Sequence, residues 1–328
     1  MRYFLRRLGF YVVALWVAVT MNFLLPRLMP GDPIDAIIAR NQGRLPPSAI
    51  NALRAQLGLS SDPLWKQYLT YLGNLAHGNL GVSFDYYPAS VSSILGQSVF
   101  WTINLLGIAL LISAGLGTLL GTIAAWRRGL ALDRFLPPVL VFIQSIPAFW
   151  VGLILIYFIG LKLHWFPVFG AISIDTDPSV KNFDYYMDVF RHAVLPATTL
   201  VLVTIGGWMV GMRNAMLNTL AEDHVVMAEA KGLPERRIMF TYAARNAVLP
   251  QVASFANALG FIIGGQFLIE FVFSYPGLGF LSIQAVFNED YPLIEGIFLF
   301  IAVAVLLANF LADIVYALLD PRVRDERG

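Results

Sequence analysis

Apolar runs recur along the chain, separated by connections that carry most of the charged residues. A helix needs about 20 mostly apolar residues to cross a bilayer core about 30 Å thick. Six runs are long enough, and each predicts a membrane-spanning helix. They lie between Arg7 and Arg27, from Phe100 to Arg127, between Arg134 and Lys162, between Arg191 and Arg213, between Arg245 and Glu270, and from Glu295 to Asp313, continuing towards Leu319. The pattern therefore predicts an all-α integral membrane protein with six transmembrane helices.

The bulk composition agrees with lipid as the solvent. Of the 328 residues, 58% are hydrophobic and 13% are charged, whereas soluble domains carry roughly 25% charged residues. The net charge of +1 gives no basic field for binding nucleic acid. The sequence contains no Cys, which excludes a disulfide framework, a thiol nucleophile and a Cys-based metal site.

A signal peptide is the alternative for the first run, because Arg2, Arg6 and Arg7 precede its apolar residues. No small-residue cleavage site follows the run, which ends in Leu-Leu-Pro-Arg. The chain then continues into Pro-Gly-Asp-Pro at residues 30–33. We therefore interpret the run as a membrane anchor.

Basic residues are distributed unequally between the two sets of connections, and this bias sets the orientation in a membrane. The N-terminus, residues 127–134, residues 213–250 and the C-terminal tail carry 14 of the 22 Lys and Arg residues. The other connections are longer in total and hold the remaining 8. Both termini are therefore predicted to be cytoplasmic, which agrees with an even number of spans.

The connection after the first run, residues 29–97, is too long for a simple turn. Asp62 followed by Pro63 is typical of an N-cap and a first helical position. We predict one transmembrane domain over residues 1–328, with residues 29–97 as an extracytoplasmic insertion. The insertion contains two candidate helices, at residues 47–57 and 63–76.

Residues 219–250 form the most informative connection. Good helix formers occupy residues 219–231, and Gly232 is suited to the positive φ of a helix end. Pro234 restarts the chain at a first helical position, with Glu235 in the first turn, where the helix dipole favours an acid. The pattern predicts a stiff elbow of two helices whose charges suit a protein partner. The alternative is a solvated hairpin without a partner.

Motifs that resemble one family are spread along the chain. The clearest is Ala-Glu-Ala-Lys-Gly-Leu at residues 228–233, with Arg-Asn-Ala at 245–247 and Leu-Pro at 249–250. It resembles the EAA loop of ATP-binding-cassette (ABC) importer permeases. The other motifs resemble the dipeptide/oligopeptide permeases among them, and they lie at residues 30–33, 57–81, 270–279 and 319–324.

The resemblance implies a type I ABC importer permease fold and a set of partners. These are a second homologous permease subunit, two cytoplasmic ABC ATPase subunits, an extracytoplasmic solute-binding protein and membrane lipid. Di- and oligopeptides are the implied solutes. The implied residues of the ATPase-coupling loop are Glu222, Met227, Ala228, Glu229, Ala230, Lys231, Gly232, Leu233, Pro234 and Glu235.

Glu229 departs from the family pattern, because members of the family often carry a basic residue there. The reversed charge is expected to be matched by the partner ATPase, or to mark a subgroup. Relatives of the family also import short oligosaccharides and nickel, so these solutes are alternatives to peptides.

The chain lacks G-x-x-x-x-G-K-[ST] and any Gly-Lys pair, so it cannot cradle nucleotide phosphates by the usual loop. We expect ATP and Mg²⁺ to be bound by partner subunits, and no cofactor or metal to be bound by this chain. Its four His residues show no H-E-x-x-H spacing. The chain is therefore predicted to be a transport subunit and not an enzyme.

Polar or large side chains inside the predicted spans are candidates for the solute path, although each also fits packing between helices. Glycines four residues apart, at Gly117 and Gly121 and at Gly207 and Gly211, favour close approach of helices. The candidates for the solute path are Gln144, Trp208, Met212, Asn257 and Gln266.

Two other classes of protein are weighed against the importer. A stand-alone secondary transporter often shows repeated halves, and an intramembrane enzyme needs a paired Ser/Lys, paired Asp or His cluster within its spans. The sequence has none of these. We expect import by alternating access across a prokaryotic inner membrane.

Overall fold

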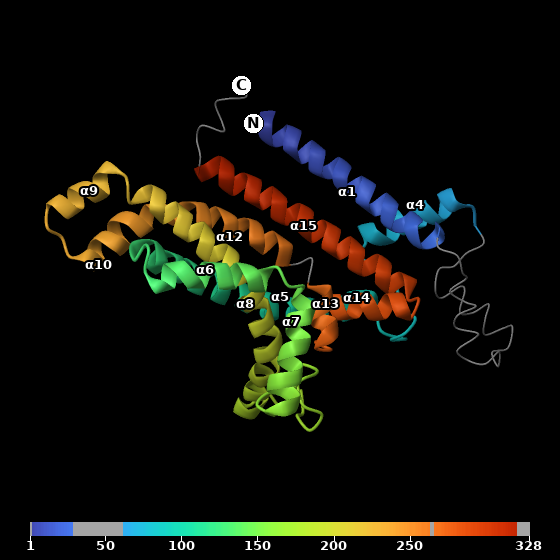
Figure 1. The fold of residues 1–328 in the computed structure, drawn as a ribbon. Coiled ribbons are helices and arrows are strands. Elements are labelled where there is room, and N and C mark those ends of the chain that lie inside the picture. The colour runs from blue at the N-terminus through green and yellow to red at the C-terminus, as the bar shows by residue number, and fades with distance from the viewer. Residues whose placement is uncertain (1, 29–61, 263–265, 320–328) are drawn as a thin grey trace. The chain divides into compact units, whose positions relative to one another are not determined.

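The computed structural model describes residues 2–28, 62–262 and 266–319, which form helices and the connections between them (Figure 1). The chain divides into two compact units. Unit 1 comprises Met1–Trp101 and Gly277–Leu311, and unit 2 comprises Thr102–Pro276 and Ala312–Gly328. The helix predicted at residues 47–57 lies outside the described residues.

In unit 1, the first and last long helices lie side by side. The rings of Tyr11 and Phe310 meet edge to face at 5.5 Å between centroids. Further along, Asn22 Nδ2 donates to the carbonyl oxygen of Glu295 at 2.7 Å. The helices of this unit are α1 (Arg2–Leu28), α4 (Leu64–Ala76), the first part of α5 (Val91–Trp126), α14 (Leu278–Phe287) and most of α15 (Tyr291–Leu319).

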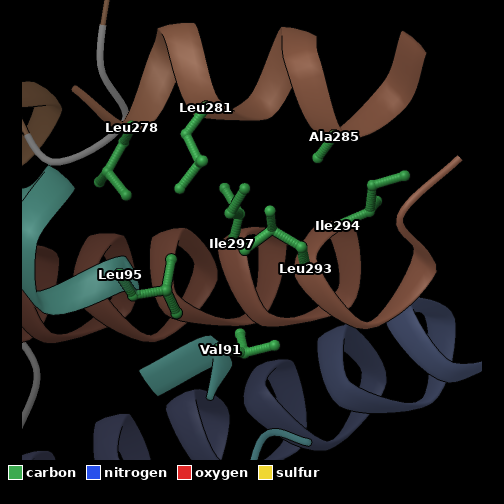
Figure 2. Packing of buried hydrophobic residues seen from close by; sticks show 8 residues of the cluster. All are labelled: Val91, Leu95, Leu278, Leu281, Ala285, Leu293, Ile294 and Ile297. Carbon is green, nitrogen blue, oxygen red and sulfur yellow. The ribbon is translucent and has the colours of Figure 1, made fainter. Parts of the chain in front are cut away.

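The core of unit 1 is a cluster of aliphatic side chains from α5, α14 and α15 (Figure 2). The spacing of the α15 members places them on one face of the helix. Gly296 allows α15 to approach α5 closely, because a Cβ at this position would collide with the side chain of Val91. The members of the cluster are Val91, Leu95, Leu278, Leu281, Ala285, Leu293, Ile294 and Ile297.

The predicted helix at residues 63–76 is confirmed as α4, but its start differs by one residue. Pro63 occupies the N-cap position, and no side chain caps the helix there. The prediction that Asp62 is the N-cap is therefore wrong. The Asp62 carboxylate instead pairs with Lys66 Nζ at 2.9 Å. Gly78 follows the helix with a φ of +71°.

Unit 2 is built around α8 (Phe183–Thr219), a helix of 37 residues. The other members are the second part of α5, α6 (Ala131–Gln144), α7 (Ala148–Leu155), the π-helical segment η1 (Ile156–Lys162), α9 (Asp223–Ala230), α10 (Glu235–Arg237), the π-helical segment η2 (Ile238–Ala244), α11 (Arg245–Ala247), α12 (Leu249–Ile262) and α13 (Phe267–Val272).

The third predicted span is not one helix. It consists of α6 and the α7–η1 segment, which meet at an angle of 100°. The break falls at residues 145–147, where Pro147 has an extended ψ of 130° at the N-cap of α7. Proline has no backbone N–H and disfavours the helical conformation of the residue before it. The two halves therefore change direction there.

Among the described residues, α5, α8 and residues 291–310 of α15 are long and apolar enough to cross a membrane. The bent pair of α6 and α7–η1 passes the same test only when its two halves are taken together, which gives up to four spans by length and composition. The first and fifth predicted spans correspond to shorter apolar helices. The first is the Gly9–Leu24 part of α1. Within the fifth predicted span the structure describes the 14-residue helix α12 and the short helix α13.

Glycines allow α5 and α6 to pack tightly against α8. A Cβ on Gly117 would lie 2.5 Å from the Cβ of Trp208, and a Cβ on Gly121 would collide with the backbone of α8. The predicted role of this pair is confirmed. Of the predicted pair on α8, Gly211 is close to α12, because a Cβ there would lie 2.7 Å from Gln251 Nε2, whereas Gly207 makes no such close contact. The contact with α6 is made by Gly206, where a Cβ would lie 2.9 Å from the carbonyl oxygen of Leu140.

Candidate functional site

We define the elbow as the segment Asp223–Ala247, which comprises α9, a turn, α10, η2 and α11 (Figure 1). The expected helix over residues 219–231 is interrupted before α9. The N–H groups of Ala221 and Glu222 bond three residues back, and Glu222 has an extended ψ of 145°. A tightened last turn followed by an extended residue ends α8, so α9 forms a separate arm.

The turn of the elbow closes around Gly232, whose φ is +68°. The Gly232 N–H donates to the carbonyl oxygen of Glu229 at 2.8 Å, and the Leu233 N–H donates to that of Ala228 at 3.4 Å. This pair of bonds is a Schellman motif, which satisfies the last carbonyls of a helix. The predicted helix break at Gly232 is confirmed.

The second arm restarts one residue later than predicted. Pro234 takes the N-cap position with a ψ of 139°, and Glu235 is the first residue of α10. The prediction that Pro234 is the first helical residue is therefore wrong, while Glu235 does lie in the first turn. From Ile238 the arm continues as the π-helical segment η2.

The inner face of the elbow is apolar and packs on the end of α8. Ala228 is 2% exposed, and the partly buried Leu233 packs against the same cluster. A small residue at position 228 lets α9 approach its neighbours closely, which gives the Ala of the motif a steric reason. The cluster comprises Ala125, Met212, Met216, Val225, Ala228, Ile238, Ala243 and Ala247.

The exposed residues of the elbow, with the adjoining Glu222, include an apolar pair and seven charged residues. The side chains of Val226 and Met227 are 53% and 60% exposed. Protein interfaces commonly combine an apolar centre, in which Met is enriched, with a polar rim. The seven charged residues are Glu222, Asp223, Glu229, Lys231, Glu235, Arg236 and Arg237.

His224 joins the two arms of the elbow, a role that the sequence does not reveal. Its Nε2 lies 3.2 Å from the carbonyl oxygen of Tyr242 and 3.0 Å from Asn246 Nδ2. Its Nδ1 lies 3.2 Å from a carboxylate oxygen of Glu222. Tyr242 and Asn246 lie 18 and 22 residues further along the chain than His224, so no local sequence pattern marks them as its partners.

An ion pair connects the start of α6 to α8. Arg213 Nε donates to Asp133 Oδ1 at 2.5 Å, and the N–H of Gly129 donates to Asp133 Oδ2 at 2.9 Å. The Asp133 side chain is only 7% exposed. The sequence marks Arg213 as part of a basic connection, but it does not pair it with an acid 80 residues away.

Two of the five candidates for the solute path share a cavity within unit 2. Trp208 and Gln266 line a space of about 230 Å³ together with apolar residues of α5 and with Ser113 and Thr204. Gln144 is the last residue of α6, and its side chain lies against α8 close to Gly206.

The other two candidates lie elsewhere in unit 2. Met212 is 1% exposed and belongs to the cluster beneath the elbow. Asn257 is exposed on α12.

A buried carboxyl group that the sequence did not single out lies on α13. Glu270 is fully buried, and Thr102 Oγ1 donates to its Oε1 at 2.8 Å. Gln266 is the N-cap of α13, and its carbonyl oxygen accepts the N–H of Glu270 at 3.1 Å. Glu270 therefore links α13 to α5 one turn away from the cavity residue Gln266.

Comparison with known proteins places these features in one family. The family of binding-protein-dependent transport system inner membrane components matches residues 117–325. The chain is 36% identical to the di/tripeptide transport system permease protein DppB of Pseudomonas aeruginosa, over 98% of both chains. It is 31% identical to the dipeptide transport system permease protein DppB of Escherichia coli over the full length of both. It is also 31% identical to the oligopeptide transport system permease protein AppB of Bacillus subtilis, over 98% of both.

These relatives cover the chain from end to end, and their family has the type I ABC permease fold. The predicted resemblance is thereby confirmed, and so is the prediction that this chain is not an enzyme. The chain belongs to the inner membrane components of binding-protein-dependent transport systems, and it is a multi-pass permease subunit of an ABC importer that works with a separate ATPase and a solute-binding protein.

Proposed function

We propose that this permease moves di- and oligopeptides into the cytoplasm. The relatives named above are di/tripeptide, dipeptide and oligopeptide permeases, and each matches nearly the whole chain. The single observation that carries the coupling mechanism is the elbow, a rigid helical knob with an anchored inner face, an exposed apolar pair and exposed charged residues.

The elbow is the docking surface for a cytoplasmic ATPase. Ala228 and Leu233 hold the turn on α8, while Met227, Glu229 and Lys231 face outwards. ATP and Mg²⁺ are bound by the ATPase, and this chain binds no cofactor. The complete importer contains a second homologous permease subunit and two ATPase subunits, so two elbows are gripped at once.

The bias of basic residues supports a cytoplasmic position for both termini and for residues 219–250. Residues 29–97 then form an extracytoplasmic insertion of a single permease domain. Solute crosses by alternating access: ATP binding draws the two elbows together and opens the cavity outwards, and hydrolysis reverses the motion. The cavity beside Trp208 and Gln266 is the proposed part of the solute path. Gln144, Met212 and Asn257 do not line this cavity and are proposed members of the path elsewhere in unit 2.

The test is uptake by the complete importer reconstituted in vesicles with its binding protein. We expect ATP-dependent accumulation of a labelled dipeptide, and no accumulation when the binding protein or ATP is omitted. Uptake of a short oligosaccharide or of nickel without uptake of peptide would contradict the proposed solute. Uptake by the purified chain without any ATPase would contradict the proposed energy coupling.

A further inference from the structure

A second cavity lies within unit 1, and nothing in the proposed coupling mechanism uses it. It encloses about 380 Å³, within the range of roughly 300–1,000 Å³ that is typical of ligand pockets. Its walls come from the end of α1, from α4, from residues 79–82 and from the first turns of α15. Its charged and polar lining residues are Arg27, Asp62, Gln67, Thr70, Tyr71, Asn74, Asn79 and Glu295.

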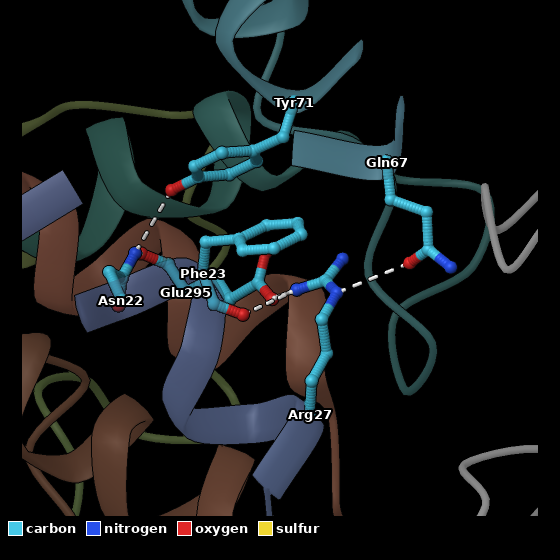
Figure 3. Close-up of polar contacts among 6 residues, drawn as sticks. All are labelled: Asn22, Phe23, Arg27, Gln67, Tyr71 and Glu295. Carbon is cyan, nitrogen blue, oxygen red and sulfur yellow. Dashed lines mark hydrogen bonds and ion pairs between the residues drawn. The ribbon is translucent and has the colours of Figure 1, made fainter. Parts of the chain in front are cut away.

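An ion pair forms one side of this cavity (Figure 3). Arg27 Nη1 donates to Glu295 Oε1 and to the carbonyl oxygen of Phe23, both at 2.8 Å. Arg27 Nε donates to Gln67 Oε1 at 3.4 Å, and the guanidinium lies 3.8 Å from the centre of the Phe23 ring. Asn22 donates to the backbone oxygen of Glu295. The pair is therefore held in place by neighbours on α1 and α4.

The ion pair leaves a donor and an acceptor unused. A guanidinium has five N–H groups, and the three on Nη1 and Nε have the partners given above. Within the described part of the chain, Arg27 Nη2 donates to no group and Glu295 Oε2 accepts from none. No buried side-chain oxygen among the described residues lacks a partner, so Oε2 is accessible, and Glu295 lines the cavity.

We propose that this cavity binds a short peptide through its charged ends. The peptide carboxylate accepts from Arg27 Nη2, and the ammonium group donates to Glu295 Oε2 or to Asp62. The amide groups of Gln67, Asn74 and Asn79 are hydrogen-bonding groups for the peptide backbone, while Leu80 and Val82 provide apolar contacts for the peptide's side chains.

The charge of the site selects this ligand class. Arg27 and Glu295 neutralise each other, and Lys66 neutralises Asp62, so a ligand with a single net charge gains one contact and meets one repulsion. A zwitterion gains at both groups, and charge-assisted hydrogen bonds are about twice as strong as neutral ones. Burial raises the pKa of the Tyr71 phenol above its ordinary value.

The inference rests on the proposed function, because the orientation derived from the basic residues places this cavity on the extracytoplasmic side. There it would receive a peptide released by the binding protein. The cavity of unit 1 is then a first binding site for the peptide on the permease, in addition to the cavity beside Trp208 and Gln266.

The test is photo-cross-linking of the complete importer in lipid nanodiscs with the dipeptide p-benzoylphenylalanyl-alanine. We expect label within residues 62–82 or 291–299, located by mass spectrometry. Alanyl-alanine should compete for labelling about tenfold better than its N-acetylated, C-amidated form, because the capped peptide lacks both charges. Labelling elsewhere only, or equal competition by both peptides, would overturn the proposal.

Asn74→Phe fills the cavity from α4, and Asn74 makes no side-chain hydrogen bond to the described residues. This variant should lose labelling of the cavity, whereas Ala76→Phe, on an exposed position of α4 that does not line it, should keep labelling. Unchanged labelling of Asn74→Phe would overturn the site. Peptide uptake measured in parallel separates the two claims: uptake without labelling removes this site alone, and labelling without uptake removes the proposed transport function alone.

Discussion

The N–H of Leu233 donates to the carbonyl oxygen of Ala228 across the turn of the elbow, at 3.4 Å. This bond requires the intervening Gly232 to hold a φ of +68°. The same turn places Leu233 against the buried cluster on α8. The backbone of one glycine therefore determines how the second arm of the elbow turns back from the first.

Gly232→Val should misdirect the elbow, because a β-branched side chain at positive φ costs roughly 1–2 kcal/mol. No atom lies within 4 Å of a Cβ built at this position, so the effect is one of backbone conformation and not of collision. We expect normal insertion but reduced ATPase binding and uptake. Gly73→Val, at a helical position with equally open surroundings, is the matched control. Equal uptake by both variants would show that the bend is not needed.

Ala228→Leu should weaken the packing of α9 on α8, since overfilling a tight core site costs about 1–3 kcal/mol. Ala228 is 2% exposed, whereas the neighbouring Ala230 is exposed. Ala230→Leu is therefore the control for a change of size alone. Limited proteolysis of the elbow in the purified importer would measure the difference, and equal protection of the two variants would contradict the packing argument.

Glu229→Arg tests the charge that departs from the family pattern. The residue is exposed, so the substitution leaves the elbow cluster intact. If Glu229 meets a basic group on the ATPase, reversal should cost a few kcal/mol for a desolvated pair and little for a pair at the rim. Pull-down of the ATPase and solute-stimulated ATP hydrolysis should both fall, and a compensating charge change on the ATPase should restore them. Unchanged ATPase binding and unchanged stimulation of ATP hydrolysis would contradict the proposed contact between Glu229 and the ATPase.

Asp133→Ala should destabilise unit 2. It leaves the Arg213 guanidinium and the Gly129 N–H without their acceptor, and an unsatisfied polar group of this kind costs roughly 1–3 kcal/mol. We expect a lower unfolding temperature in detergent. Asp184→Ala, at an exposed acid in the first turn of α8, should change it little. The same unfolding temperature for both would show that the ion pair does not contribute.

The orientation can be tested with reporter fusions. A reporter after Gly328 and one inserted within residues 225–240 should both be cytoplasmic, because the basic residues gather in those connections. A reporter within residues 40–90 should be extracytoplasmic. A cytoplasmic result for the last fusion would show that the number of spans before it is wrong.

The sequence by itself determined the features that depend on local chemistry. Long apolar runs predicted the membrane helices, and the composition excluded a soluble fold. The helix break at Gly232 and the helix over residues 64–76 follow from glycine's freedom at positive φ and from short-range patterns. The motif of the elbow and the motifs at residues 30–33, 57–81, 270–279 and 319–324 together indicated the family, because each is contiguous in the chain.

Only the tertiary structure decided which distant residues meet. Arg27 and Glu295 are 268 residues apart, and Asp133 and Arg213 are 80 apart. The sequence also does not reveal the bend of 100° between α6 and α7, or that Gly206 and not Gly207 lies at the contact of α8 with α6. Apolar patterns show that a helix is buried or faces lipid, but they carry no information about its partner. Register, direction and the pairing of charges are set when whole helices pack, since packing selects among arrangements that satisfy the same local pattern.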